Sequence, residues 1–225
     1  LGGDEFGMLL VGLGSADAAS HVADAILAEA AAPFALKEGT AILSASVGIA
    51  ALPAGPIESR ELHRRADVAA YAAKRSGRSC WKRFSGALDD DVGSRRALAA
   101  DLSAAVKARR DVDIVYTPIM SARSGAIDGV EISAVWRHPE LGDIYPERFA
   151  SIAEEAGLVI PFGEWIFETA CRTLSAIPGI AISVNVTPKQ MRDRPFADRV
   201  LQILADNGIA PERLHLEVAE RGGYL

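Results

Sequence analysis

The run Ile180-Ala181-Ile182-Ser183-Val184-Asn185-Val186 decides the fold class of this chain. It is a short, mostly apolar run with β-branched residues, which is typical of a core strand. A helix is expected from about 195 to Asn207, ended by Gly208, and a second strand-like run follows over 214–218. A strand, a helix and a strand in this order form a parallel α/β unit, so the sequence predicts an α/β fold.

The same alternation extends toward the N-terminus. Strand-like runs are expected at 41–50, 81–84, 114–116 and 127–135, with a hairpin at 1–12. Helices are expected where apolar residues recur every three or four positions, over 16–31, 62–77, 95–110, 146–157 and 162–175. Alternation over the whole length supports the α/β assignment.

A change of composition separates the two halves of the chain. Residues 85–94 contain two glycines and three successive aspartates, which is typical of a linker. We therefore expect a first domain over 1–84, a linker over 85–94 and a second domain over 95–225.

The composition of the 225 residues narrows the partners and the compartment. The formal net charge of −6 argues against a nucleic-acid partner. Cys80 and Cys171 match no metal-binding spacing, so free thiols in a reducing compartment are expected. No apolar run approaches the roughly 18 residues that a membrane helix needs, so no membrane contact by this segment is expected. We expect a cytoplasmic segment, whose parent protein can itself be anchored in a membrane.

The opening run, Leu1-Gly2-Gly3-Asp4-Glu5-Phe6, contains the first candidate site. A glycine pair allows positive φ and lets a ligand approach the backbone closely. The carboxylates of Asp4 and Glu5 are hard oxygen ligands for a divalent metal. This combination suits a nucleoside triphosphate with its metal.

A basic segment supplies the second part of this candidate site. Residues 60–84 contain eight lysines and arginines against two acidic residues, and composition alone is explained as well by a solvated helix face. Lys74 and Arg78 lie four residues apart at a helix end, so both side chains can point at one anion. Together with the glycine pair they favour a triphosphate site.

The second candidate site consists of Glu131, Asn185 and Glu217. Each lies at or near the end of a strand-like run, and in a barrel of parallel strands the carboxyl ends of the strands converge on one site. Three oxygen ligands there would favour Mg²⁺ or Mn²⁺. Taken singly, each residue is better explained as a surface or structural polar group, and the three together favour a shared site without establishing one.

The first half of the chain resembles the GGDEF family, the diguanylate cyclases. The blocks that carry the resemblance are Gly2–Phe6, Ser44–Ala50 and Ala66–Arg78. It implies a homodimer of the parent protein in which the 3′-hydroxyl of one GTP attacks the α-phosphate of another. It also implies roles for single residues: Gly2 and Gly3 pack against GTP, Asp4 takes part in binding, Glu5 is a metal ligand and catalytic residue, and Lys74 and Arg78 hold the terminal phosphates.

The second half resembles the EAL phosphodiesterase family. The blocks that carry this resemblance are Trp136–Gly142, Pro146–Phe149, Ala153–Leu158, Gly163–Trp165, Val184–Thr187 and Leu214–Glu220. The fold implied is the C-terminal part of a GGDEF α/β domain followed by the first strands and helices of an EAL-type TIM barrel. We expect a piece of a tandem GGDEF–EAL protein, cut at both ends, whose small-molecule partners are GTP and cyclic di-GMP. Cyclase activity from this chain alone is not expected.

The EAL resemblance implies a metal-dependent hydrolysis of cyclic di-GMP. Glu131, Asn185 and Glu217 would ligate Mg²⁺ or Mn²⁺, with Glu131 also catalytic. Glu220, also counted as catalytic, would anchor the loop that carries further ligands. A metal-activated water would then attack a phosphodiester of cyclic di-GMP.

Three departures from the EAL pattern leave alternatives open. The name-giving motif reads Glu131-Ile132-Ser133, Val135 stands where the family usually has an arginine, and Thr117 replaces a glutamine. Losing a charged contact to phosphate should weaken substrate binding. A receptor that binds GTP or cyclic di-GMP without turnover is therefore the alternative to an enzyme, and a scaffold without either ligand is a third possibility.

Two features are interpreted as structural. His138 lies in the block Trp136–Gly142, just after the strand-like run 127–135. By the resemblance to the EAL family, we interpret it as a turn residue rather than a catalytic base. Phe162, Trp165 and Phe167 are interpreted as core residues rather than a stacking platform for a base.

Overall fold

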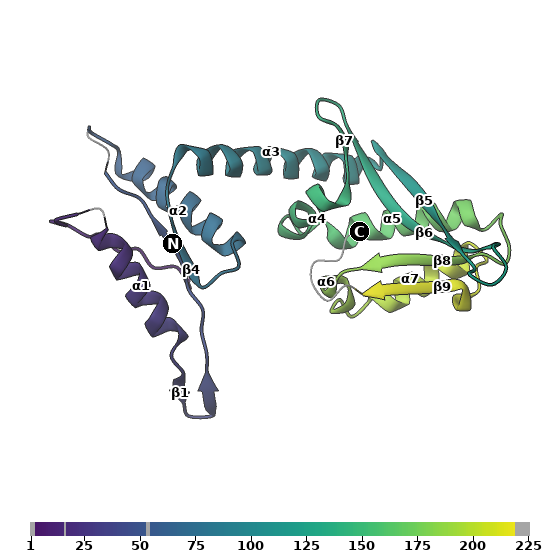
Figure 1. The fold of residues 1–225 in the computed structure, drawn as a ribbon, viewed down its shortest axis with the longest axis horizontal. Helices are drawn as coiled ribbons and strands as arrows, with labels where there is room; N and C mark the ends of the chain where they lie inside the picture. Colours follow the sequence, from purple (N-terminus) through teal and green to yellow (C-terminus); the bar gives the residue numbers. More distant parts are fainter. Residues whose placement is uncertain (1–2, 16, 53–54, 219–225) are drawn as a thin grey trace. The chain divides into compact units, whose positions relative to one another are not determined.

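A computed structural model describes residues 3–15, 17–52 and 55–218 of the chain (Figure 1). The chain divides into two compact units, Leu1–Arg95 and Arg96–Leu225, and each unit is described by itself. The α/β class expected from the sequence is confirmed, since helices and strands alternate in both units. Among the described residues, no helix combines the length and the apolarity needed to cross a membrane.

In its described residues, the first unit contains two small sheets and two helices that precede α3 (Gly86–Ala108). Its elements are α1 (Ala18–Ala31), β1 (Phe34–Leu36), β2 (Gly39–Ala41), β3 (Ser46–Ile49), α2 (Ser59–Arg75) and β4 (Cys80–Arg83). Strands β1 and β2 form an antiparallel hairpin, and β3 pairs with β4 in parallel. Because β3 and β4 are parallel, the chain must cross over between them, and α2 is that crossover.

Helix α2 packs closely on β3 through small residues. Its buried face carries Val68, Ala69, Ala72 and Ala73, whose spacing matches one side of a helix. Strand β3 contributes Gly48 to this contact. A Cβ atom built on Gly48 would lie 2.0 Å from the carbonyl oxygen of Ala66 and 2.3 Å from the backbone nitrogen of Ala70. The absence of a side chain at Gly48 therefore sets how near the helix lies to the strand.

The hairpin expected over 1–12 is wrong for the described residues 3–12. Residues 3 and 4 form a turn, and no strand is assigned from Glu5 to Gly12. A strand needs a neighbouring strand to satisfy its backbone hydrogen bonds, and none of the described strands pairs with this run. Its apolar side chains are exposed as a result, with Phe6 at 94% and Val11 at 83%.

The segment expected to be a linker, 85–94, is helical from Gly86 onward. Helix α3 runs from Gly86 to Ala108, and the boundary between the two units falls within it. Two of the three aspartates form ion pairs, since Arg64 Nη1 lies 2.7 Å from Asp89 Oδ1 and Arg75 Nη1 lies 2.5 Å from Asp91 Oδ2. Val92 is 1% exposed. These contacts fix the start of α3 on the first unit.

Up to Val218, where the described part of the second unit ends, its strands form one mixed sheet. Its strands are β5 (Val112–Met120), β6 (Ile127–His138), β7 (Gly142–Ile144), β8 (Ala181–Val186) and β9 (Leu214–Val218). The strand order is β5-β6-β8-β9, with β7 also paired to β6. Strands β6, β8 and β9 are mutually parallel as the sequence predicted, whereas β5 and β7 run antiparallel to β6.

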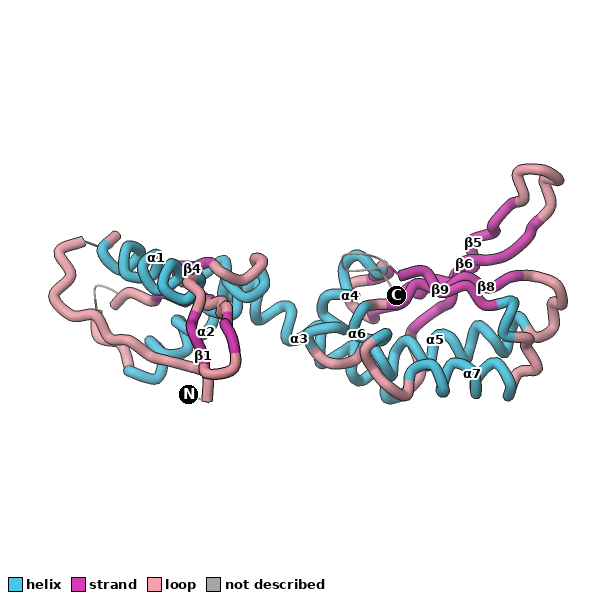
Figure 2. The backbone as a smooth tube through the Cα atoms, turned by 90° about the horizontal axis from the view of Figure 1, so that it is seen from below, coloured by secondary structure: helices cyan, strands magenta, loops and turns pink. Residues whose placement is uncertain are grey.

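Helices cover one face of this sheet. They are α4 (Pro146–Glu155), α5 (Val159–Leu174), α6 (Pro188–Met191) and α7 (Phe196–Asp206), with a short 3₁₀ turn, η1 (Pro211–Arg213), before β9. Figure 2 shows α5 and α7 lying along the sheet. The core between them contains Ile132 from β6, Ile182 and Val186 from β8, and Phe167 from α5. Side chains alternate along a strand, so the odd-numbered residues of β6, β8 and β9 face the other side.

A chain of aromatic rings fills the neighbouring part of the core. Trp136, Phe149, Phe162 and Trp165 meet edge to face in sequence, with ring centroids 5.4–6.3 Å apart. Phe162 is 0% and Trp165 7% exposed, and Phe167 is 5% exposed. The interpretation of Phe162, Trp165 and Phe167 as core residues is therefore confirmed.

Candidate functional site

Three adjacent parallel strands bring Glu131, Asn185 and Glu217 together. Glu131 on β6 is in register with Ser183 on β8, and Asn185 on β8 is in register with Glu217 on β9. All four side chains belong to the face opposite the helices, because they alternate with the core residues of their strands. The three candidate ligands, 54 and 32 residues apart in sequence, thus occupy neighbouring strands of one sheet face.

Two diagonal hydrogen bonds connect these residues. The Asn185 Nδ2 amide donates to Glu131 Oε1 at 2.7 Å. The Ser183 hydroxyl donates to Glu217 Oε1. The middle strand, β8, therefore supplies the donor for the carboxylate on each side of it. Each bond uses one carboxylate oxygen and leaves Oε2 of that carboxylate, together with Oδ1 of Asn185, as acceptors on the same face.

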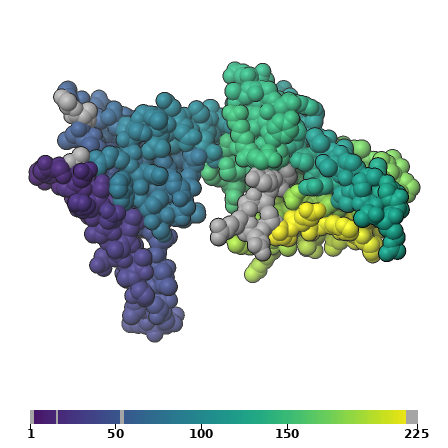
Figure 3. Space-filling view, viewed as in Figure 1, coloured from purple at the N-terminus to yellow at the C-terminus, as the bar shows by residue number. Residues whose placement is uncertain are grey.

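Burial differs among the four residues. Ser183 is 1% exposed, Glu131 and Asn185 are half-buried, and Glu217 is exposed. Figure 3 shows β9, in yellow, at the surface of the second unit. The site therefore lies on a solvent-accessible face of the sheet, and the Ser183 hydroxyl is the buried group among the four.

The donor set fits a hard divalent cation. Two carboxylates and one amide oxygen are the ligand types that Mg²⁺ and Mn²⁺ prefer. In the part of the chain that the structure describes, no cluster of three or more His, Cys, Asp or Glu side chains is placed to hold a metal. The candidate set is consistent with this, because its third member is an asparagine.

The three departures from the EAL pattern lie around this site. Thr117 on β5 is in register with Glu131, and Val115 is in register with Ser133. Val135 is 4% exposed, so this position presents a buried apolar side chain and no charge. Glu220, expected to anchor a loop, lies outside the described residues.

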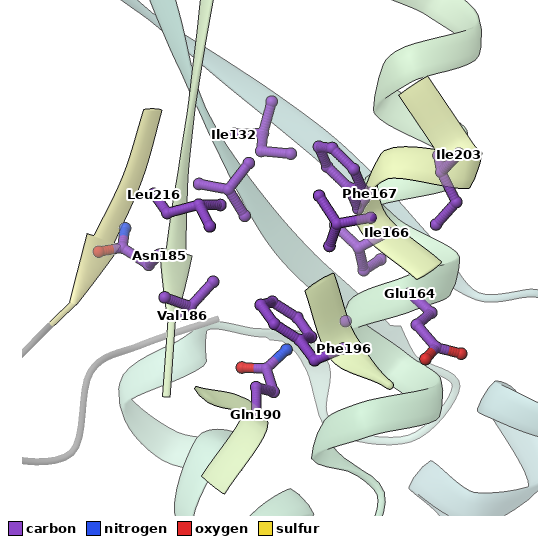
Figure 4. Close-up of a pocket in the computed structure, with 13 residues that line it drawn as sticks. Ile132, Glu164, Ile166, Phe167, Asn185, Val186, Gln190, Phe196, Ile203 and Leu216 are labelled. Atoms are coloured by element: carbon purple, nitrogen blue, oxygen red, sulfur yellow. The ribbon is translucent and has the colours of Figure 1, made fainter. Parts of the chain in front are cut away.

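An apolar pocket lies on the opposite, helical side of the sheet. It is lined mostly by aliphatic and aromatic side chains of β6, β8, α5 and α7, among them Ile132, Phe167 and Phe196. Figure 4 shows the Asn185 carboxamide pointing away from Phe167 and Phe196. The pocket is thus a loosely filled part of the core, and Asn185 lines it while turning its carboxamide toward the other face of the sheet.

The residues of the first candidate site lie in two segments of the first unit. Gly3 and Asp4 form an exposed turn, Glu5 follows and is exposed, and Gly2 lies outside the described residues. Lys74 is exposed near the end of α2, and Arg78 follows in a left-handed turn with φ of 61°. The convergence of these two segments on one nucleotide stays a prediction.

His138 is the last residue of β6, and its side chain holds the turn that follows. Its Nδ1 accepts hydrogen bonds from the backbone N–H groups of Glu140, at 3.2 Å, and Leu141, at 3.1 Å. With Nδ1 accepting, Nε2 carries the proton and faces Asp101 Oδ2 at 3.3 Å. Because both nitrogens are used within the fold and the side chain is buried, the interpretation of His138 as structural is confirmed.

Ser183 is the site residue that sequence reasoning missed. Its position two residues before Asn185 placed it on the same strand face, which the period of two in a strand makes visible in the sequence. Its bond to Glu217 depends on the pairing of β8 with β9, which the sequence does not show.

Each half of the chain matches a known protein family. Residues 99–223 match the family described as "EAL domain", and residues 1–80 match "Diguanylate cyclase, GGDEF domain".

Two relatives illustrate the similarity over nearly the whole chain. The bifunctional diguanylate cyclase/cyclic di-GMP phosphodiesterase MucR of Pseudomonas aeruginosa is 33% identical over 98% of this chain and 33% of its own length. The uncharacterized protein y4lL of Sinorhizobium fredii is 34% identical over 98% of this chain and 27% of its own length. The chain therefore spans between about a quarter and a third of the length of these two curated relatives.

A solved structure has a fold similar to that of about half of this chain. The structure described as "PaMucR Phosphodiesterase, c-di-GMP complex" is 30% identical to this chain, with a TM-score of 0.51. The match covers 55% of this chain and 52% of the solved one.

Proposed function

Since the chain belongs to the EAL domain family and its residues 1–80 match the GGDEF domain family, we propose that its parent protein acts in cyclic di-GMP signalling. The reaction that we assign to the second unit is metal-dependent hydrolysis of cyclic di-GMP. Among its relatives, MucR is named as both a cyclase and a phosphodiesterase of this nucleotide.

One observation carries this proposal. Glu131, Asn185 and Glu217 lie on adjacent parallel strands and face the same side, and Asn185 donates to Glu131 at 2.7 Å. Three oxygen-bearing side chains at neighbouring positions form the kind of arrangement that holds Mg²⁺ or Mn²⁺. The shared sheet face and the hydrogen bond between Asn185 and Glu131 favour one common site over three unrelated polar groups.

The residues of the chain have separate tasks in this proposal. Glu131 and Glu217 supply negative charge at either side of β8, and Asn185 orients Glu131 while offering its own Oδ1. The cation, when bound, supplies Lewis acidity that stabilises charge on phosphate oxygens and makes water more acidic. Glu220 would anchor a loop with further ligands.

For the first unit we propose GTP binding, with synthesis of cyclic di-GMP in a homodimer of the parent. The GGDEF match over residues 1–80 supports this proposal. Gly2, Gly3 and Asp4 would contact the nucleotide, Glu5 would bind the metal, and Lys74 and Arg78 would hold the phosphates.

The finer description of the fold belongs to the same proposal. Residues 1–84 would be the later part of a GGDEF domain, and residues 95–225 the first strands and helices of an EAL barrel. The parallel strands β6, β8 and β9 support the barrel, since their order follows the chain. We place this segment in the cytoplasm.

Hydrolysis is tested by replacing a ligand. The full-length protein is incubated with cyclic di-GMP and Mg²⁺ or Mn²⁺, and products are separated by chromatography. Glu131→Gln should lower the rate by at least about a hundredfold, because even residues outside the ligand shell cost 10–100-fold. Asp128→Asn is the matched control, since Asp128 lies on the same strand and is exposed. Equal rates for the two variants would refute the assignment.

Cyclisation is tested separately with GTP as substrate. Glu5→Gln should abolish formation of cyclic di-GMP and leave its hydrolysis intact. A variant that still makes cyclic di-GMP from GTP at the parent's rate would contradict the role of Glu5.

A receptor without turnover is the second candidate. The observation in its favour is Val135, a buried apolar side chain at the position where the EAL family usually has an arginine. Calorimetry with cyclic di-GMP decides between the two: binding without hydrolysis by the full-length protein supports the receptor, and turnover supports the enzyme.

A further inference from the structure

We propose that Ser183 is a positioning residue of the candidate metal centre, whose hydroxyl holds the Glu217 carboxylate ready for a divalent cation. The inference rests on the proposed function, because it concerns the same site. Its starting point is the hydrogen bond from the Ser183 hydroxyl to Glu217 Oε1.

The place of Ser183 in the sheet explains why it can serve this purpose. It lies on the middle strand, level with Glu131 on β6 and His215 on β9. Its side chain is 1% exposed, whereas Glu217 is exposed on β9. A buried donor on the middle strand therefore meets the carboxylate of an exposed residue.

Holding that carboxylate has a consequence for cation binding. A free glutamate side chain loses rotamer freedom when it becomes a ligand, and this loss opposes binding. A hydroxyl that already selects one orientation reduces the loss, because the ordering has occurred before the cation arrives. The bond engages Oε1 and leaves Oε2 for the cation, so it orients the ligand without blocking it.

The symmetry with Asn185 supports the same conclusion. Asn185 Nδ2 holds Glu131 Oε1 at 2.7 Å, and Ser183 holds Glu217 Oε1, so each flanking carboxylate has one donor from β8. A serine is a poor choice for a buried strand position on packing grounds, where β-branched residues such as Val are favoured. A buried hydroxyl needs a hydrogen-bond partner, and the Glu217 carboxylate is that partner.

The test measures Mn²⁺ affinity of the full-length protein without substrate, from the spectroscopic signal of free Mn²⁺. Titration of Glu131→Gln first defines the Mn²⁺ bound at other sites. Ser183→Ala should weaken the remaining affinity by about tenfold or more, within the range seen for groups that orient metal ligands. Ser133→Ala is the matched control, since Ser133 lies on the neighbouring strand and is half-buried. Ser133→Ala should change the Mn²⁺ affinity by less than about threefold, which is well below the roughly tenfold loss expected when an orienting contact is removed.

An isosteric pair keeps the test decisive if Ser183→Ala fails to fold. Ser183→Thr keeps the hydroxyl, and Ser183→Val has the same shape without it. The threonine variant should bind Mn²⁺ about tenfold tighter than the valine variant at equal melting temperature. A merely structural role would change the melting temperature and leave the two affinities equal.

The outcomes separate this inference from the proposed function. If the parent protein and Glu131→Gln bind the same amount of Mn²⁺, the metal centre itself is absent and both proposals fail. If the Glu131-dependent Mn²⁺ site exists and the threonine and valine variants bind alike, the role of Ser183 alone is overturned.

Discussion

Gly48 shows how a single missing side chain sets the distance between two elements. The atoms that an added Cβ would meet, Ala66 O and Ala70 N, belong to the backbone of α2 and cannot rotate away. The helix or the strand would have to move, and such overpacking costs about 1–3 kcal/mol.

Gly48→Ala should therefore destabilise the protein by about 1–3 kcal/mol in urea unfolding. Gly93→Ala is the control, because Gly93 lies within α3 and an added Cβ there meets nothing within 4 Å. It should stabilise the protein by about 0.5–1 kcal/mol, since alanine favours a helix over glycine. If the two substitutions changed stability in the same direction, the close approach of α2 to β3 would be in doubt.

The two cysteines differ in their access to solvent. Cys171 is 0% exposed, and burial raises its pKa to about 12 although the charge of Arg213 partly opposes the shift. Cys80 is half-buried, and its thiol donates to the carbonyl of Ala73 at 3.4 Å. The reactive form of a thiol is the thiolate, so Cys171 should be unreactive near neutral pH.

A thiol reagent at pH 8 should therefore modify Cys80 in the folded protein and Cys171 only after unfolding. In Cys80→Ser no rapidly reacting thiol should remain. The raised pKa also predicts that the contribution of Cys171 to stability is complete below about pH 9 and decreases as the pH rises toward 12, because only the unfolded state ionises in that window. Rapid labelling of Cys171 in native Cys80→Ser would contradict its burial.

Helix α3 is held at its start by charged side chains of α2. Arg64 pairs with both Glu61 and Asp89 at 2.7 Å. These contacts hold the pKa of Glu61 at about 2, where the hydrogen bond from Arg64 is the largest cause, and they lower the pKa of Asp89 as well. The contribution of Glu61 is therefore present above about pH 4.5 and is lost as the pH falls toward 2.

Asp89→Asn should consequently loosen the first turns of α3. Hydrogen exchange at pH 7 should become several-fold faster for the amides of residues 88–95, with little change in α5. Asp90→Asn is the control, because Asp90 is exposed on the same helix. If both variants exchanged at the parent's rate, the ion pair would have no part in holding the helix.

At the level of the whole molecule, sequence patterns predicted the features that arise from local periodicity. The alternation of strands and helices, the parallel relation of β6, β8 and β9 and the shared face of Glu131, Asn185 and Glu217 all agree with the structure. Apolar period and the spacing of α/β units depend on nearby residues, so a single sequence contains them.

The features that sequence patterns missed depend on distant partners. Residues 85–94 resemble a linker in sequence, whereas in the structure Asp89 and Asp91 pair with Arg64 and Arg75 and the segment from Gly86 is helical. The run after Gly3 resembles a strand, but no described strand pairs with it. The bond of Ser183 to Glu217 needs the register of β8 against β9. Each requires knowledge of which segments meet in space.

Strand β8 lies between β6, which carries Glu131, and β9, which carries Glu217. The polar site therefore depends closely on the register of β8 with these two strands. Side chains alternate along a strand, so a slip of one residue would exchange Ser183 and Asn185 for Ile182 and Val184. Two hydrocarbon groups would then separate Glu131 from Glu217, and neither carboxylate would keep its donor. The polar site on this face therefore depends on the register of a six-residue strand. Insertions or deletions in the turns flanking β8 should be far less tolerated than those in the turn between β5 and β6.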